Sequence, residues 1–156
     1  MAGDEVPSTA SRRDEDVREL AHRLVAAFGA GDLETYFACF ADDATFAFPT
    51  HPEVLTSLQA HRRQRWEHED AFTVLGCATS EAHWQVWSDA AVLVHRVATT
   101  VRAAGSESAL DERGTIVFHR RAQGWRAVHE HLFVHPGAIR PTGTAVAAPT
   151  PGAPVS

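Results

Sequence analysis

The chain has 156 residues, 44% of them hydrophobic, and a formal net charge of −6, values that suit one globular domain with a single core. The negative charge, without a compensating basic stripe, argues against nucleic acid as a partner. No apolar run approaches the ~20 residues that cross a bilayer, and no secretory signal is evident, so we expect a cytoplasmic protein that does not bind membranes.

Three segments differ in composition. Residues 1–13 are polar and are expected to form a flexible N-terminus. Residues 14–137 carry the periodic apolar patterns of a folded domain. Residues 138–156 are rich in proline and alanine and are expected to form a disordered tail.

The first part of the domain has helical periodicity. Apolar residues recur at helical spacing from Val17 to Phe28, and the following glycines end this first helix. Asp32 is a suitable N-cap for a short second helix, because its carboxylate can accept a hydrogen bond from a free backbone N–H group. A brief strand is expected over 45–48, and Pro52 is expected to open a third helix.

From residue 72 onward the pattern is typical of strands. Strand-like segments cover 72–79, 81–88, 91–102, 110–121 and 125–134, and turn signals separate them. Helices followed by a run of long antiparallel strands predict an α+β fold. We expect three N-terminal helices to pack on one face of a strongly curved, cone-shaped antiparallel sheet.

The hairpin within 113–136 sets the register of the last two strands. Gly124 ends an expected three-residue loop, where the backbone must be left-handed, so Arg121 should pair with Trp125. Alternation then assigns one face to Gly114, Ile116, Phe118, Val128, Glu130 and Leu132. The other face receives Arg113, Thr115, Val117, His119, Trp125, Ala127, His129, His131 and Phe133. Both faces mix apolar and ionisable side chains, so we expect one to line a cavity and the other to meet a second subunit.

The order of elements resembles the nuclear transport factor 2-like superfamily, above all its SnoaL-like domains and the association domain of calcium/calmodulin-dependent protein kinase II. The motifs that carry the resemblance are GDLE at 31–34, ADDAT at 41–45, and the strand pair with T-x-V at 115–117 and W-x-x-V-H-x-H at 125–131. The resemblance spans about 14–136 and implies a cystatin-like α+β barrel. This superfamily includes isomerases, polyketide cyclases, dehydratases, epoxide hydrolases and oligomerisation modules, so the fold alone does not decide the function.

Two known sites of this superfamily are only partly present. The carboxylate base of ketosteroid isomerases aligns with Phe48, so their proton shuttle has no counterpart here. Alignment with the kinase association domain retains a pocket histidine at His61 and one pocket arginine at Arg96. Its two other arginine positions hold Ile116 and Leu132.

The resemblance and the hairpin register both assign Glu130 to the cavity. One strand further out, Arg96 is expected level with Ile116, about 10 Å from Glu130 at the backbone. Apolar neighbours would raise the pKa of Glu130 and Arg96 would lower it, a balance that suits a general acid or base. We therefore predict Glu130, Arg96 and His61 as catalytic residues. The predicted substrate-binding wall consists of Phe48, Trp66, Ile116, Phe118 and Leu132.

Two other interpretations of these residues stay open. Glu130 and Arg96 could form an inert buried ion pair, and His61 could be a solvated helix residue. His129 and His131 share a face and could bind a metal ion, but no carboxylate accompanies them, so we favour interface hydrogen bonds and expect no metal or cofactor. The cysteines lack metal-type spacing and are expected to be free thiols.

The function expected from these residues is acid/base chemistry. We predict a small cofactor-independent enzyme of the isomerase, cyclase or dehydratase type that acts on a mostly apolar small molecule. The chain contains no lysine and is rich in alanine and arginine, which is typical of GC-rich bacterial genomes and favours specialised metabolism such as polyketide biosynthesis. The alternative is a non-catalytic ligand-binding or oligomerisation module. In either case we expect a homodimer that forms through the outer sheet face.

Overall fold

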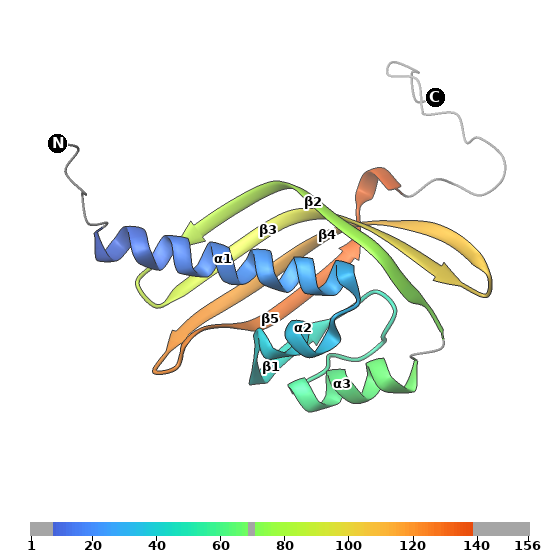
Figure 1. Cartoon of the computed structure of the whole chain (residues 1–156), viewed down its shortest axis with the longest axis horizontal. Coiled ribbons are helices and arrows are strands. Elements are labelled where there is room, and N and C mark those ends of the chain that lie inside the picture. Colours follow the sequence, from blue (N-terminus) through green and yellow to red (C-terminus); the bar gives the residue numbers. More distant parts are fainter. Residues whose placement is uncertain (1–7, 69–70, 139–156) are drawn as a thin grey trace, which may run out of the picture.

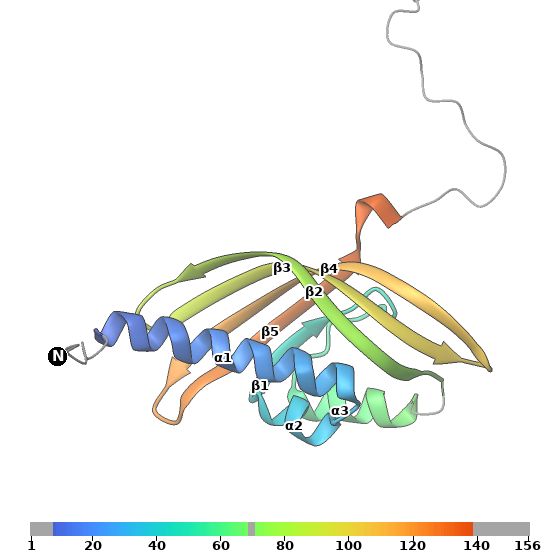
Figure 2. The ribbon, with the colours of Figure 1, turned by 45° about the horizontal axis from the view of Figure 1, so that its top comes forward.

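The computed structural model describes residues 8–68 and 71–138. Figures 1 and 2 show a curved sheet that arches over three helices, which all lie on one side of it. The elements are α1 (Thr9–Ala30), α2 (Leu33–Ala38), β1 (Phe40–Ala47), α3 (Leu58–Glu67), β2 (Thr73–Val86), β3 (Ala90–Ala103), β4 (Ser106–Arg121), β5 (Gly124–Val134) and the short 3₁₀ helix η1 (Pro136–Ala138). The expected disordered tail lies almost entirely outside the described residues, as does most of the expected flexible N-terminus.

Local capping explains where the first two helices begin and end. Ser8 accepts a hydrogen bond from the N–H of Ser11, so α1 begins at Thr9, within the segment that we expected to be flexible. Gly31 ends α1 in a left-handed conformation with φ 71°. Asp32 caps α2 by accepting from the N–H of Thr35, as predicted.

The predicted start of the third helix at Pro52 is wrong. Ser57 is the N-cap, its side chain accepts from the N–H of Ala60, and α3 begins at Leu58. The preceding residues are extended instead, because Leu55 exchanges two backbone hydrogen bonds of 2.8 and 2.9 Å with Phe46 of β1. This pairing holds the segment between β1 and α3 against β1, and α3 follows at the end of the sheet (Figure 1).

The sheet is open, with the strand order β1-β5-β4-β3-β2. The β1–β5 pair is parallel and the other pairs are antiparallel. The end strands β1 and β2 are not paired with each other, so the expected barrel is an open, strongly curved sheet. The predicted segments 72–79 and 81–88 form one strand, β2, with an irregularity between Ser80 and His83 where Glu81 has φ 52°. No helix in the described parts of the chain is long and apolar enough to cross a membrane.

The β4–β5 hairpin contains a bulge that the sequence analysis did not predict. Gly124 has the expected positive φ, 101°, but it pairs with Arg121, so the loop has two residues rather than three. Near the loop the pairing is one residue off the predicted register. Between Ala127 and His129 the register shifts, because Val128 is an extra residue on β5.

This bulge restores the predicted pairing further along β5. Ile116 pairs with Glu130, and Glu130 is buried while its neighbour His131 is exposed, as predicted. On the loop side of the bulge the prediction is wrong: Trp125 and Ala127 are buried in the core instead of facing outward. The extra residue thus reverses which side chains face inward in the part of β5 between the loop and Val128.

The register of β3 differs from our expectation by three residues. Ala104 and Gly105 form a two-residue loop in which both residues have positive φ, 50° and 79°, so Ala103 pairs with Ser106. Leu93 rather than Arg96 is therefore level with Ile116. The buried face of β3 consists of Ala91, Leu93, His95, Val97, Thr99 and Val101. The predicted inward orientation of Arg96 is wrong, because a shift by an odd number of residues turns a side chain to the opposite face.

Candidate active site

A cavity of about 130 Å³ lies between the helices and the inner face of the sheet. The surface of its wall is mostly apolar. Helix α1 contributes Leu24, Val25 and Phe28 to this wall, and the sheet contributes Val97, Ile116 and Leu132. Phe48 and Phe72, which lie in the connections around α3, add two aromatic rings. Because most of the wall surface is apolar, the polar side chains in it lie in an environment of low polarity.

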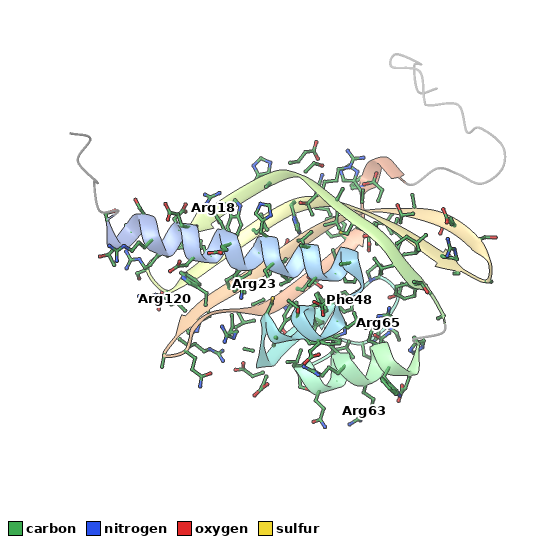
Figure 3. The ribbon with its side chains drawn as sticks, viewed as in Figure 1. Arg18, Arg23, Phe48, Arg63, Arg65 and Arg120 are labelled. Atoms are coloured by element: carbon green, nitrogen blue, oxygen red, sulfur yellow. The ribbon has the colours of Figure 1, made fainter. Side chains whose placement is uncertain are left out.

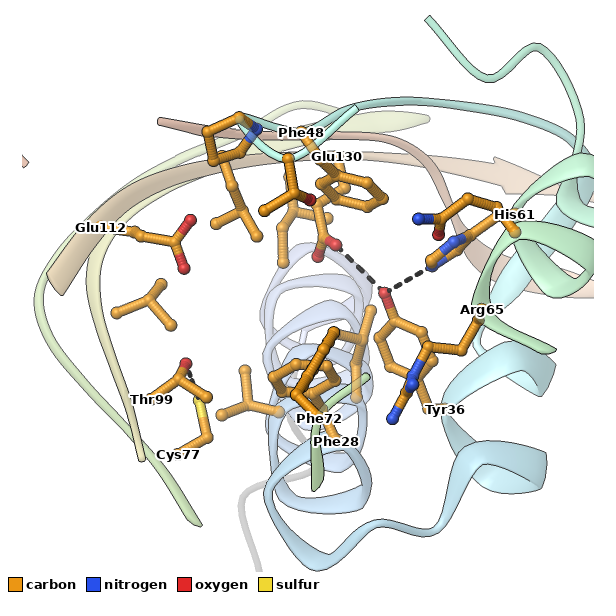
Figure 4. A pocket seen from close by; sticks show the side chains of 18 of the residues that line it. Phe28, Tyr36, Phe48, His61, Arg65, Phe72, Cys77, Thr99, Glu112 and Glu130 are labelled. Atoms are coloured by element: carbon orange, nitrogen blue, oxygen red, sulfur yellow. Dashed lines mark hydrogen bonds between the residues drawn. The ribbon is translucent and has the colours of Figure 1, made fainter. Parts of the chain in front are cut away.

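Three polar side chains from separate elements form a hydrogen-bonded chain within the cavity (Figure 4). The hydroxyl group of Tyr36, on α2, donates to Oε1 of Glu130, on β5, at 3.1 Å. The same hydroxyl lies 3.2 Å from Nε2 of His61, on α3. All three residues are at most 7% exposed, so we call them the buried triad.

Aromatic packing holds two members of the buried triad in place. The ring of Tyr36 lies among Phe28, Phe37 and Phe40, with centroid distances of 5.4, 5.2 and 5.1 Å. The ring of His61 lies 4.4 Å from Phe46 and 5.1 Å from Phe48. Both rings are thus fixed by the core, which limits the movement of their polar atoms.

Burial moves the pKa of each member of the triad. Loss of hydration raises the pKa of Glu130 to about 7; the hydrogen bond from Tyr36 opposes this rise, and the charge of Glu112 adds to it. Loss of hydration, together with the charge of Arg65, lowers the pKa of His61 to about 4. Burial also raises the pKa of Tyr36 well above its usual value.

These pKa values define the protons of the triad near neutral pH. His61 is neutral and Tyr36 keeps its proton, while Glu130 exchanges its own proton close to pH 7. When Glu130 is ionised, Tyr36 donates to it, and the oxygen of Tyr36 can accept from a proton on Nε2 of His61. Glu130 can therefore take up and release one proton while Tyr36 and His61 stay in place.

A second group of polar residues lines the cavity away from the triad. Glu112 of β4 is 8% exposed, and Figure 4 shows its carboxyl group pointing into the cavity. Burial raises the pKa of Glu112 and lowers that of His95. The hydroxyl of Thr99 lies 3.8 Å from the sulfur of Cys77, and both cysteines of the chain are free, as predicted.

The structure brings together most of the residues predicted for the site. Glu130 and His61 both line the cavity, and so do Phe48, Ile116 and Leu132. His61 is buried in the cavity wall, which contradicts the interpretation of a solvated helix residue.

Three predicted site residues lie elsewhere. Arg96 projects from the opposite sheet face, where it donates two hydrogen bonds to Asp111, at 2.9 and 2.6 Å, so it is not paired with Glu130. Trp66 is 76% exposed, because it lies about 100° around α3 from Arg65, outside the stripe of residues that lines the cavity. Phe118 is fully buried in the core, stacked on Trp84 at 5.8 Å, behind the cavity wall.

Sequence reasoning missed Tyr36, since its position on the apolar side of α2 marked it only as a core residue. One signal was available: a buried tyrosine hydroxyl requires a hydrogen-bond partner, and the core of this chain contains few polar candidates. Glu112 could also have been found, because it continues the inward alternation of Gly114 and Ile116 along β4.

The two histidines of the possible metal pair lie on the outer face. His129 is hydrogen-bonded through Nδ1 to the hydroxyl of Thr45 at 2.7 Å, and its ring lies 6.4 Å from that of His131. Within residues 8–68 and 71–138, no three His, Cys, Asp or Glu side chains are arranged to hold a metal ion. His129 is thus committed to a contact between β5 and β1.

Comparisons with known proteins agree with this architecture. The family model for the SnoaL-like domain matches residues 17–134. A comparison with curated proteins gives no match.

Many solved structures are similar. An NTF2-like protein of unknown function in nutrient uptake from Rhodospirillum rubrum is 27% identical, with a TM-score of 0.66, over 77% of this chain and 98% of that one. A putative Ca/calmodulin-dependent kinase II association domain from Exiguobacterium sibiricum is 14% identical, with a TM-score of 0.68, over 83% and 96% of the two chains. A ketosteroid isomerase-like protein from Erwinia carotovora atroseptica is 15% identical, with a TM-score of 0.65, over 76% and 92%. At such identities the last two similarities establish the fold alone.

Proposed function

The chain belongs to the SnoaL-like domain family, and we propose that it is a small cofactor-independent enzyme that performs acid/base chemistry of the isomerase, cyclase or dehydratase type. The observation that carries this proposal is the buried carboxyl group of Glu130, whose pKa is about 7 and which faces an apolar cavity. A place in bacterial specialised metabolism is favoured by the composition of the chain.

In this proposal Glu130 is the general base or acid. A group whose pKa lies near the working pH is present in both protonation states and can remove a proton from the substrate and return it elsewhere. Its Oε1 is held by Tyr36, while Oε2 makes no hydrogen bond to any residue that the structure describes. The substrate proton would be transferred to this second oxygen.

Tyr36 and His61 support this transfer. Tyr36 keeps its proton and donates it as a hydrogen bond, either to ionised Glu130 or to a negatively charged oxygen that develops on the substrate. Neutral His61 fixes the position of the Tyr36 hydroxyl. His61, which we predicted as catalytic, thus becomes a positioning residue in the proposal.

The substrate would be a mostly apolar small molecule with one or two oxygen atoms. The wall formed by Phe28, Phe48, Ile116 and Leu132 offers apolar contacts, and the cavity volume of about 130 Å³ limits the size of the buried part. Within this wall, proton removal from a carbon next to a carbonyl group is the step that Glu130 and Tyr36 can perform together.

Proton removal can be tested before the natural substrate is known. Small aryl and alkyl ketones and 1,3-diketones are incubated with the protein in D₂O, and NMR measures deuterium incorporation next to the carbonyl group. We expect the protein to accelerate incorporation for at least one compound and Glu130→Gln to lose this acceleration. Incorporation by Glu130→Gln at the wild-type rate would remove Glu130 from the mechanism.

The alternative is a ligand-binding or oligomerisation module that does not turn its ligand over. The fold likeness to a putative kinase association domain favours it, and so does the outer sheet face, where the large apolar side chain of Phe133 is 38% exposed. A homodimer through this face is compatible with both functions. Native mass spectrometry of the wild type and of Val117→Arg, a change at the centre of this face, tests the dimer.

A further inference from the structure

Arg65 is a charged cavity residue that the proposed acid/base step does not use. It lies one helical turn after His61 on α3 and lines the same cavity. Its guanidinium carbon lies 4.6 Å from the centroid of the Phe72 ring. Its Nε and Nη1 atoms are shielded from water and donate to no acceptor among the described residues. Buried N–H groups without acceptors are costly, so this guanidinium group requires a partner.

The charge of Arg65 acts directly on the buried triad. It lowers the pKa of His61 and opposes the rise in the pKa of Tyr36. The acidic side chains of the cavity do not neutralise it, because Glu130 and Glu112 make no ion pair with it and burial favours their protonated forms. The α3 side of the cavity is therefore positively charged.

The position of Arg65 on α3 distinguishes it from an ordinary surface arginine. His61, Gln64, Arg65 and His68 follow the helical repeat and all line the cavity. The preceding arginines, Arg62 and Arg63, are exposed. In Figure 3, Arg63 points away from the body of the molecule, whereas Arg65 lies on the side of α3 that faces Phe48.

We propose that Arg65 binds a carboxylate, or a comparably anionic oxygen group, of the substrate, so that the substrate class is an apolar organic acid. A carboxylate matches the planar fork of N–H groups on a guanidinium group and can accept two hydrogen bonds from it. The apolar part of the acid then lies along Ile116 and Leu132, where Glu130 can reach it. This inference rests on the proposed function, because it treats the ligand of the cavity as the substrate of Glu130.

Binding of matched acids and amides tests the inference without an enzymatic assay. Benzoate, 3-phenylpropanoate and 4-phenylbutanoate are each compared with the corresponding amide by calorimetry at pH 6, where the acids are ionised and Glu130 is mostly protonated. We expect the best-fitting carboxylate to bind about tenfold more tightly than its amide, since a charged hydrogen-bond pair is lost with the amide. Equal affinities for acid and amide, or binding of neither throughout the series, would overturn the inference.

Two substitutions on the same helix provide the matched comparison. Arg65→Gln should lose the preference for the acid, whereas Arg63→Gln removes the same charge from the exposed side and should keep it. Arg65→Lys retains the charge without the fork and should keep a preference of about threefold. If Arg65→Gln does not fold, the Arg65→Lys result decides: a full tenfold preference in that variant would contradict binding by the guanidinium group.

The outcome is separable from that of the proposed function. Glu130→Gln should keep the Arg65-dependent preference for acids while it loses deuterium exchange. If the preference survives in Arg65→Gln but exchange depends on Glu130, only the inference about the acid fails. If exchange is independent of Glu130 while the preference depends on Arg65, the proposed enzyme fails and an acid-binding module remains.

Discussion

The two faces of the sheet hold similar ionisable groups in different surroundings. On the outer face Asp111 accepts two hydrogen bonds from Arg96, and this contact lowers the pKa of Asp111. On the inner face Glu130 accepts one hydrogen bond from a neutral hydroxyl, and burial raises its pKa to about 7. Asp111 is thus permanently ionised near neutral pH, whereas Glu130 can exchange a proton there.

Charge pairing and proton chemistry require opposite environments. An arginine partner stabilises the ionised carboxylate and removes its ability to act as an acid near pH 7. A buried carboxyl group with only a hydroxyl partner keeps that ability, at a cost in stability when it ionises. Arg96 was expected beside Glu130, and its true place outside the cavity leaves the pKa of Glu130 high.

The largest effect is expected on proton transfer. Glu130→Gln should reduce deuterium exchange by about 100-fold or more, because general acid/base groups typically contribute factors of that size. Asp111→Asn, the same chemical change on the outer face, should leave the exchange rate within about twofold of the wild type. A large loss in Asp111→Asn would show that the two faces are not independent.

The next effect concerns the pH dependence of stability. An unperturbed glutamate carboxyl group, as in the unfolded chain, has a pKa of 4.5, and burial raises the pKa of Glu130 to about 7 in the folded protein. Between pH 4.5 and pH 7, Glu130 is therefore ionised in the unfolded chain but still protonated in the folded protein. The stability that Glu130 contributes is present below pH 4.5 and is lost as the pH rises toward 7.

The side chain of Glu130→Gln cannot ionise, so this variant lacks the decrease in stability that ionisation of Glu130 causes as the pH rises. The free energy of unfolding of Glu130→Gln, relative to the wild type, should therefore rise by about 1.4 kcal/mol per pH unit over this range, about 3 kcal/mol in total. Urea unfolding at a series of pH values measures it. His61→Asn should show the opposite trend between about pH 4 and 6.5, because the pKa of His61 is lowered from 6.5 to about 4. A constant difference between the wild type and Glu130→Gln across this range would contradict the raised pKa.

A smaller effect is expected for Tyr36→Phe, which removes the hydroxyl partner of Glu130. Its hydrogen bond favours the ionised carboxylate, so its loss should raise the pKa of Glu130 and move the rise of the exchange rate to higher pH. At pH 7 the rate should fall by about tenfold, the value of one hydrogen bond to a charged group. The pH profile of deuterium exchange measures both changes. A profile with an unchanged midpoint would argue against contact between Tyr36 and Glu130.

The smallest effect is expected for Arg96→Ala. This exposed ion pair is screened by solvent, so its removal should change the melting temperature by no more than about 3 °C. Deuterium exchange and its pH midpoint should match those of the wild type, since Arg96 does not line the cavity. A shifted midpoint would indicate that Arg96 acts on Glu130 after all.

The strand register shows how far sequence reasoning reached. The inward position of Glu130 was predicted from Gly124, and it is correct because Val128 bulges and compensates a loop that is one residue shorter than expected. No compensation occurs on β3, so the three-residue difference there, an odd number, turned Arg96 outward and His95 inward. Alternation along a strand is readable from the sequence, but its phase depends on loop length and bulges.

The α+β class, the cap at Asp32, the left-handed glycines at 31 and 124 and the apolar character of the core follow from the sequence itself. These features depend on interactions within a few residues or on hydrophobic periodicity, and both can be recognised in a short stretch of the sequence. The tertiary structure alone decided that Tyr36 meets Glu130, 94 residues away, and that Nε and Nη1 of Arg65 are buried nearby without an acceptor among the described residues. Burial sets the pKa of a carboxyl group, and only the packing of distant elements determines which groups are buried together.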